Sequence, residues 1–217
     1  MPDSTADKWN ARYASSPGDI APASTVLLKG LRWLPDSAVQ CDEQTIDSSS
    51  DASDTEGNAE TGTTMATDRR KAHDLACGRA GNAYLLAELG FCVSAWDISD
   101  TIIDQINQQR PLRIDHAEVR DISQQPPEPE SFDVIVVSRF LDRSICPAIS
   151  QALKPDGVLF YQTFVHGLSN PDFLLAPNEL LSLFSELHIL EYHEPAKDAD
   201  GKAEARLIAR RTGRTGT

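Results

Sequence analysis

A loop of small residues, followed about twenty positions later by an acid, constrains the fold of this chain most strongly. The loop, DLACGRAGN at residues 74–82, precedes a helical pattern that runs to residue 89. Small residues between a strand and a helix let a ligand approach the backbone, and the free N–H groups of the helix start face that ligand. Residues 91–97 predict a second strand that ends in Asp97, at the distance where such folds hold a ribose. Loop and acid together predict a nucleotide-cofactor site.

Strand and helix patterns alternate through the rest of the chain. Strands are expected at 72–75, 92–96, 117–119, 132–137 and 158–164, and helices at 81–89, 100–109, 141–153 and 177–186. Two extended segments, 188–193 and 205–210, close the chain around turn-like residues 198–201. This order predicts an α/β, Rossmann-like, doubly wound fold. Its mainly parallel seven-stranded sheet would carry a C-terminal antiparallel hairpin and helices on both faces.

Residues 1–70 divide into two parts that differ in composition. Residues 1–40 predict two short helices, at 5–13 and 23–33, which would form a helical cap or lid. Residues 41–70 are rich in Asp, Ser and Thr and almost free of large apolar groups, so they cannot offset their ordering entropy. We expect a disordered acidic insertion there, either a tolerated surface insertion or a regulated tether. The core would then be residues 71–212.

The net charge of −13 and the absence of a long apolar run limit the partners of the chain. Such a charge disfavours nucleic acid, although the insertion supplies much of it. No apolar run reaches the roughly 20 residues of a membrane span, and the N-terminal residues lack a secretory pattern. We expect a cytoplasmic protein without a membrane partner, as a monomer or a dimer. Four cysteines without a paired spacing, Cys41, Cys77, Cys92 and Cys146, predict reduced thiols.

Four passages of the chain carry a resemblance to a known family: DKWNARY at 7–13, DLACGR at 74–79, the segment 132–143, and LKPDG at 153–157. Together they resemble class I S-adenosyl-L-methionine-dependent methyltransferases, and among these the bacterial tellurite-resistance (TehB-like) group. The resemblance implies S-adenosylmethionine as the cofactor and a small molecule as the methyl acceptor. A thiol or a tellurite- or selenite-type oxyanion would be a suitable soft nucleophile.

The resemblance also implies a set of cofactor-binding residues. Asp74 would orient the loop and help hold the methionine amino group, and Asp97 would accept hydrogen bonds from both ribose hydroxyls. Asp121 would accept from the adenine amino group, and the Ser138 carbonyl would face the methionine ammonium. The full set is Trp9, Tyr13, Asp74, Ala76, Cys77, Gly78, Ala80, Asn82, Asp97, Ile98, Asp121, Ile122, Ser138 and Phe140.

The loop departs from the family pattern Asp-x-Gly-x-Gly-x-Gly at two glycine positions, which here are Ala76 and Ala80. Alanine is tolerable at position 76 if its φ stays negative, and it is less suitable at position 80 if φ is positive. The substitutions are expected to lower cofactor affinity and to leave the fold intact. A degenerate, non-catalytic cofactor-binding domain that regulates a partner therefore stays as the alternative function.

Three residues are candidates for the catalytic step. Arg139 would face the exit of the methyl group, and His166 follows the fifth strand on the carboxyl edge, where doubly wound folds bind ligands. An acceptor that needs a base would find it in His166 or Tyr161, whereas a soft anionic nucleophile needs none. The sequence has SRFL at 138–141 in place of Asn-Pro-Pro-Tyr, which disfavours methylation of amino groups in nucleic acid or protein.

Several of these residues have structural alternatives. Asp97 could cap the following helix, and Asp121 could be a solvated turn residue. Asp142 and Arg143 fit a surface pair better than substrate ligands, and His73 fits a packed strand position. His188 and His193 would point to opposite faces of a strand, so no metal site is expected. A nicotinamide dehydrogenase is the rival enzyme, but the loop lacks Gly-x-Gly-x-x-Gly.

Overall fold

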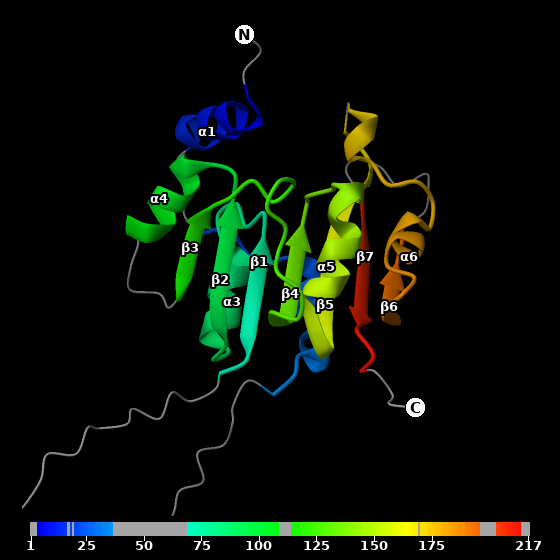
Figure 1. Ribbon diagram of the computed structural model, residues 1–217. Coiled ribbons are helices and arrows are strands. Elements are labelled where there is room, and N and C mark those ends of the chain that lie inside the picture. Colours follow the sequence, from blue (N-terminus) through cyan, green and yellow to red (C-terminus); the bar gives the residue numbers. More distant parts are fainter. Residues whose placement is uncertain are drawn as a thin grey trace, which may run out of the picture.

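One mixed sheet forms the centre of the computed structural model, which describes residues 4–16, 18, 20–36, 69–108, 114–168, 170–195 and 203–213. Its strand order is β3-β2-β1-β4-β5-β7-β6 (Figure 1). The first five strands are mutually parallel, and β7 is antiparallel to both β5 and β6. The predicted fold is confirmed. The strands are β1 (Lys71–Leu75), β2 (Cys92–Asp97), β3 (His116–Val119), β4 (Phe132–Ser138), β5 (Leu153–His166), β6 (His188–His193) and β7 (Ala203–Arg210).

Helices cover both faces of the sheet because successive side chains of its buried strands point to opposite sides. In β4, Val134 and Val136 belong to one core cluster, whereas Ile135 and Val137 belong to the other. The first cluster includes side chains of α2 (Thr25–Lys29), α3 (Gly81–Glu88) and α4 (Asp100–Gln108). The second includes side chains of α5 (Cys146–Ala152) and α6 (Glu179–Leu183).

Helix α1 (Thr5–Ser15) lies beyond the carboxyl ends of the parallel strands, above α4 in Figure 1. It begins with a capping box: Ser4 Oγ accepts from the Asp7 N–H at 3.1 Å, and the Asp7 carboxylate accepts from the Ser4 N–H at 3.0 Å. None of its residues is buried. The helix is therefore attached at the edge of the sheet, and its half-buried Tyr13 packs against one core cluster.

Three predicted elements are shorter or longer than expected, for local reasons. The helix expected at 23–33 ends at Gly30, where a Cβ would lie 2.8 Å from the Phe160 ring, and continues as the turn η1 (Leu31–Trp33). Strand β5 is longer than expected. It begins at Leu153, which pairs with Phe132 of β4, and residues 154–157 then form an irregularity with Asp156 at φ 63° before the pairing resumes at Val158. The helix expected at 141–153 begins only after the turn η2 (Arg143–Ile145).

One further helix is shorter than predicted, and two predicted segments lie mostly or entirely outside the described residues. The helix expected at 177–186 is reduced to α6, which follows a left-handed Asn178 (φ 59°). The predicted acidic insertion lies outside the described residues except for Arg69 and Arg70, and residues 198–201 lie outside them entirely. In the described part of the chain, no helix is long and apolar enough to cross a membrane.

Candidate cofactor and acceptor site

Asp74 joins the end of β1 to the start of α3. Its side chain is buried, and its Oδ2 accepts from the Ala83 N–H at 3.1 Å. Its Oδ1 accepts from the Asn82 amide at 3.2 Å, and the Asn82 carbonyl oxygen in turn accepts from the Ser24 N–H at 2.8 Å. Burial raises the pKa of Asp74 to about 7, against the opposing effect of its two hydrogen bonds. A negative charge here is therefore costly unless a cation arrives beside it.

The loop after β1 contains three left-handed residues, Ala76 (φ 55°), Gly78 (φ 51°) and Ala80 (φ 56°). Alanine at position 76 was expected to be tolerable only if its φ is negative, and the structure does not meet this condition. Both alanines therefore have a backbone conformation that favours glycine. Each alanine costs about 1 kcal/mol in this conformation. Surrounding hydrogen bonds hold the loop in place: the Cys77 N–H donates to the Trp96 carbonyl and the Ala80 N–H to the Cys77 carbonyl, both at 2.9 Å.

Asp97 ends β2 and contacts the loop directly. Its side chain is 6% exposed, its Oδ2 accepts from the Gly78 N–H at 2.9 Å, and its Oδ1 accepts from the Ser99 N–H at 3.0 Å. Burial raises the pKa of this carboxyl, and the N–H donors oppose the shift. The capping role for Asp97 is not what the structure shows, because Ser99 Oγ accepts from the Ile102 N–H and so caps α4. The carboxylate therefore stands between the loop after β1 and the start of α4.

The predicted adenine residues follow β3 at the same edge. The Arg120 N–H donates to the Asp97 carbonyl at 2.8 Å, which places Asp121 next to this strand end. Asp121 is exposed, and its Oδ1 accepts from Ser123 N–H and Oγ, at 3.0 and 2.6 Å. Ile98 is half-buried at the edge, whereas Ile122 is buried in the core. Asp121 therefore forms the hydrogen bonds of a turn residue, as the alternative interpretation predicted. These bonds use only its Oδ1 and leave Oδ2 out.

Helix α1 brings its aromatic side chains to the loop. Trp9 and Tyr13 stack with their ring centroids 5.9 Å apart. The Tyr13 hydroxyl lies 3.0 Å from where a Cβ on Gly78 would be, and burial beside Asp97 raises the pKa of this phenol. Ser99 Oγ donates to the Asn10 side chain at 2.5 Å. The structure thus gathers Tyr13, Gly78 and Asp97 at one point.

The second half of the edge lies at the ends of β4 and β5. Arg139 follows Ser138 with a left-handed backbone (φ 58°), and its N–H donates to the Gln162 carbonyl at 2.7 Å. Its guanidinium donates from Nε to Glu204 at 2.6 Å and lies 5.9 Å from the Phe164 ring centroid. The Arg139 side chain is 65% exposed, whereas that of Glu204 is only 16% exposed. A mostly buried acid therefore holds an accessible cation next to the predicted methyl exit.

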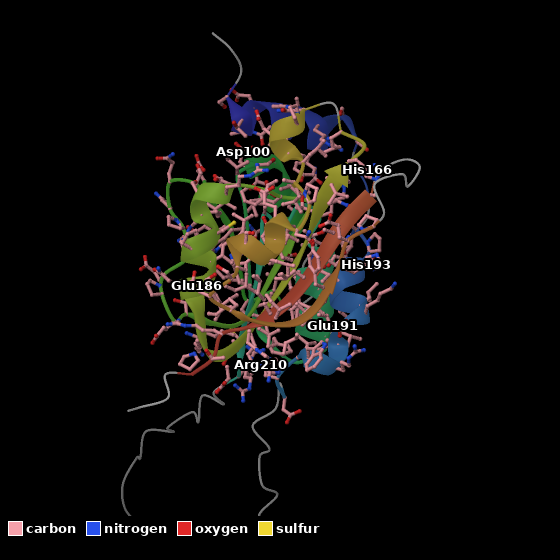
Figure 2. All side chains as sticks on the ribbon, turned by 90° about the vertical axis from the view of Figure 1, so that its right-hand side faces the viewer. Asp100, His166, Glu186, Glu191, His193 and Arg210 are labelled. Carbon is pink, nitrogen blue, oxygen red and sulfur yellow. The ribbon has the colours of Figure 1, made fainter. Side chains whose placement is uncertain are left out.

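The two candidate bases have different surroundings. Tyr161 is fully buried, and its hydroxyl donates to the Phe140 carbonyl at 2.9 Å. Burial also raises its pKa far above the usual value, so Tyr161 supports the backbone after β4 and is unsuited to act as a base. His166 is half-buried and lies at the upper end of the molecule in Figure 2. Its Nε2 is buried and has no hydrogen-bond partner among the described residues.

Other polar residues considered from the sequence have structural roles. His73 packs between Trp96 and Phe132, and burial lowers its pKa to about 3. Asp142 caps the turn η2 by accepting from the Ser144 N–H at 2.9 Å. Arg143 donates to both oxygens of Glu179 and to two backbone carbonyls, at 2.6 to 2.9 Å, so it is a structural clamp.

Sequence reasoning missed three residues of this edge, Arg79, Gln162 and Glu204. Gln162 accepts from the Val26 N–H at 2.8 Å and also contacts Glu204, so it joins α2 to β7 at this edge. No local pattern distinguishes Gln162 or Glu204, because their partners are far away in the sequence. Arg79 did offer a signal, since a long cation is unusual in a loop of small residues.

Comparisons with known proteins agree with this geometry. The family described as methyltransferase domain matches residues 72–157. The probable S-adenosyl-L-methionine-dependent methyltransferase TehB of Haemophilus influenzae (strain ATCC 51907 / DSM 11121 / KW20 / Rd) is 32% identical over 139 residues, which are 57% of this chain and 48% of that protein. The chain thus spans about half the length of the curated relatives that it matches.

Solved structures show the same fold. The crystal structure of TehB from Haemophilus influenzae has a TM-score of 0.56 at 22% identity and covers 67% of this chain and 58% of that one. The Burkholderia thailandensis 1,6-didemethyltoxoflavin-N1-methyltransferase, solved with S-adenosylhomocysteine, has a TM-score of 0.53 at 19% identity and covers 66% and 72%. The sheet order, the loop after β1 and these matches agree with the predicted resemblance: residues 72–157 match a methyltransferase domain, and the chain is similar to the S-adenosylmethionine-dependent methyltransferases of the TehB group.

Proposed function

We propose that this protein transfers a methyl group from S-adenosylmethionine to a small-molecule acceptor. The observation that carries the proposal is the bond between the Asp97 carboxylate and the Gly78 N–H, which joins the acid of β2 to the loop after β1. When bound, the cofactor supplies an electrophilic methyl group on a sulfonium. The residues present fit it, because two buried carboxylates stand at this loop and because Gly78 has no side chain there, so that even the Tyr13 hydroxyl approaches to 3.0 Å from where a Cβ would be.

The cofactor residues would divide the work along the edge. Asp97 would accept from the ribose hydroxyls, and Asp74 would stabilise the methionine ammonium, with Asn82 fixing its orientation. The Ser138 carbonyl, at the end of β4, would face the same ammonium. Ile98 and Asp121 would contact the adenine from the β2 and β3 side, whereas Trp9 and Tyr13 would cover the site from α1. Burial of the two carboxylates makes their charge available to a cationic ligand at low screening.

The chain's main catalytic task would be to align the acceptor and to exclude water, because the methyl group is already activated. A soft nucleophile such as a thiolate or a tellurite- or selenite-type oxyanion needs no base, and this agrees with the burial of Tyr161. Arg139 would orient an anionic acceptor, since its guanidinium is accessible and held by Glu204. His166 would serve an acceptor that has to lose a proton.

The proposal is tested by isothermal titration of the protein with S-adenosylmethionine, S-adenosylhomocysteine and NAD. Micromolar binding of the two sulfur compounds without NAD binding is expected, followed by turnover in a panel of thiols and oxyanions. No binding of either sulfur compound would reject the proposal. Binding without turnover for any acceptor would favour a non-catalytic cofactor-binding domain.

This second candidate function rests on the left-handed alanines of the loop, Ala76 and Ala80. If their strain weakens the site, Ala76→Gly should stabilise the protein against urea by about 1 kcal/mol and tighten cofactor binding. Ala87→Gly, inside helix α3, is the matched control and should destabilise by at least about 0.5 kcal/mol. Equal affinities for the wild type and Ala76→Gly would show that the alanine does not impair the site.

A further inference from the structure

Arg79 extends from the loop after β1 to the segment that follows α1. Its Nη1 donates to the Gly18 carbonyl at 2.8 Å, and its Nη2 donates to the Ser16 carbonyl. A Cβ on Gly18 would lie only 3.3 Å from Nη1, so the guanidinium packs closely against this glycine. The side chain is half-buried. One arginine of the loop therefore holds two carbonyls of a segment more than sixty positions earlier in the chain.

The remaining contacts of α1 involve Tyr13, which packs partly against a core cluster, and Asn10, which meets the start of α4. The Arg79 Cζ lies 5.8 Å from the Tyr13 ring centroid, and Tyr13 lies over Gly78. Asn10 accepts a hydrogen bond from Ser99 at the start of α4. No residue of α1 is fully buried, and Tyr13 packs only partly against the core cluster below, so the attachment of α1 depends largely on these contacts. Such an element opens at a lower free-energy cost than the sheet below it.

We propose that Arg79 is a positioning residue that latches α1 over the cofactor loop and so prolongs the residence of the cofactor. The inference deepens the proposed function and rests on it. The backbone of Arg79 directly follows Gly78, whose N–H is bound to Asp97. A ligand that orders the loop through Asp97 therefore also orders the base of the latch.

The coupling works in both directions, since two linked equilibria change each other by the same factor. The Tyr13 hydroxyl stands next to Gly78, and its pKa responds to Asp97, where the ribose would bind. Entry or exit of the cofactor requires α1 to move away from this point. Movement of α1 stretches or breaks the Arg79 bonds to Ser16 and Gly18, so these bonds slow the exit.

The experiment compares wild type, Arg79→Ala, Arg79→Lys and Lys8→Ala. Lys8 is the matched control, because it is an exposed cation on the same helix. The dissociation rate of S-adenosylhomocysteine is measured by surface plasmon resonance on the full chain. Hydrogen exchange of the α1 peptide and of β1 and β2 is measured with and without the same ligand.

We expect Arg79→Ala to release S-adenosylhomocysteine roughly tenfold faster, since two charge-assisted bonds are lost. The ligand should protect α1 in the wild type and in Lys8→Ala, but not in Arg79→Ala, and the strands should stay protected in all four proteins. Arg79→Lys should lie in between, because a compact ammonium does not reproduce the arginine fork.

An unchanged release rate and unchanged α1 protection in Arg79→Ala would overturn the latch and leave the proposed function standing. Slower release in Arg79→Ala would overturn it as well, because α1 would then obstruct the site. Loss of strand protection in this variant would also count against the latch, since Arg79 would then support the loop itself. Failure of the wild type to bind S-adenosylhomocysteine would instead reject the proposed function.

Discussion

The carboxyl edge of the sheet has a proposed cofactor half, at the ends of β1 and β2, and a proposed acceptor half, at the ends of β4 and β5, and the two are built differently. In the cofactor half, the buried carboxylates of Asp74 and Asp97 accept hydrogen bonds from backbone N–H groups of Ala83, Gly78 and Ser99. In the acceptor half, the exposed guanidinium of Arg139 is held by Glu204, a side chain 65 positions away. A backbone N–H donor stays in place when the side chain of its residue is substituted. An ion pair between two side chains, by contrast, is lost or altered when either residue is substituted. Under the proposed function, this difference would suit a site that keeps one cofactor while the acceptor varies.

Removal of the Asp97 carboxylate tests the cofactor half with the largest expected effect. Asp97→Ala should weaken binding of S-adenosylhomocysteine by about 1 to 3 kcal/mol, because two hydroxyl contacts are lost. The Gly78 N–H also loses its acceptor, which loosens the loop. Isothermal titration measures the affinity, and circular dichroism checks that the fold is kept.

Asp104→Ala is the control for this substitution. Asp104 is exposed on α4, near Asp97 in the sequence but directed to solvent. Its replacement should change the affinity by less than about 0.5 kcal/mol. Equal affinities for wild type and Asp97→Ala would remove Asp97 from the cofactor site and would contradict the division into two halves.

The fold, and the contact of the loop after β1 with the acid of β2, could be predicted because their signals are local. Buried parallel strands are continuous apolar runs, as in residues 132–137, and they alternate with helical periods. The loop and the acid of the next strand lie close together in the sequence, so that spacing alone associates Asp74 with Asp97. The backbone angle of Ala76 could not be predicted, because it depends on how the loop returns to β2 through the Cys77 N–H.

The acceptor half depends on contacts between distant parts of the chain, which no spacing reveals. Gln162 contacts Val26 across 136 positions, and Glu204 reaches Arg139 only because β7 is inserted between β5 and β6. Tyr161 illustrates the same limit. Its place on a strand near the edge suggested a base, but its side chain points into the core and packs beside Phe184.

The charge of Asp74 gives the second test, of intermediate size. Because burial raises its pKa to about 7, the fraction of ionised Asp74 increases about tenfold from about pH 6 to about pH 8. The ionised form favours the ligand's ammonium, so the affinity for S-adenosylhomocysteine should increase by a similar factor over this range. Titrations at several pH values measure it.

Asp74→Asn should flatten this dependence, and any remaining slope would come from Asp97, whose pKa is also raised. The folding stability of the protein without ligand depends on pH in the opposite direction. The raised pKa of Asp74 contributes stability below about pH 4, which is lost as the pH rises through about 7. Urea unfolding of the two proteins would detect this. An equally steep binding profile in Asp74→Asn would show that Asp74 is not the titrating group.

The smallest effect is expected from Arg139→Ala, and it decides whether the two halves are separate. An exposed ion pair contributes at most about 1 kcal/mol, and Arg139 faces the acceptor side, so affinity for S-adenosylhomocysteine should stay within about twofold of the wild type. The KM of an anionic acceptor should rise more than that of a neutral thiol, because only the anion uses the guanidinium. Glu204→Gln, which frees the arginine from its acid, is the companion variant and should leave the cofactor affinity similarly unchanged. A large loss of cofactor affinity in Arg139→Ala would mean that the guanidinium binds the methionine carboxylate, and that one cation serves both ligands across the edge.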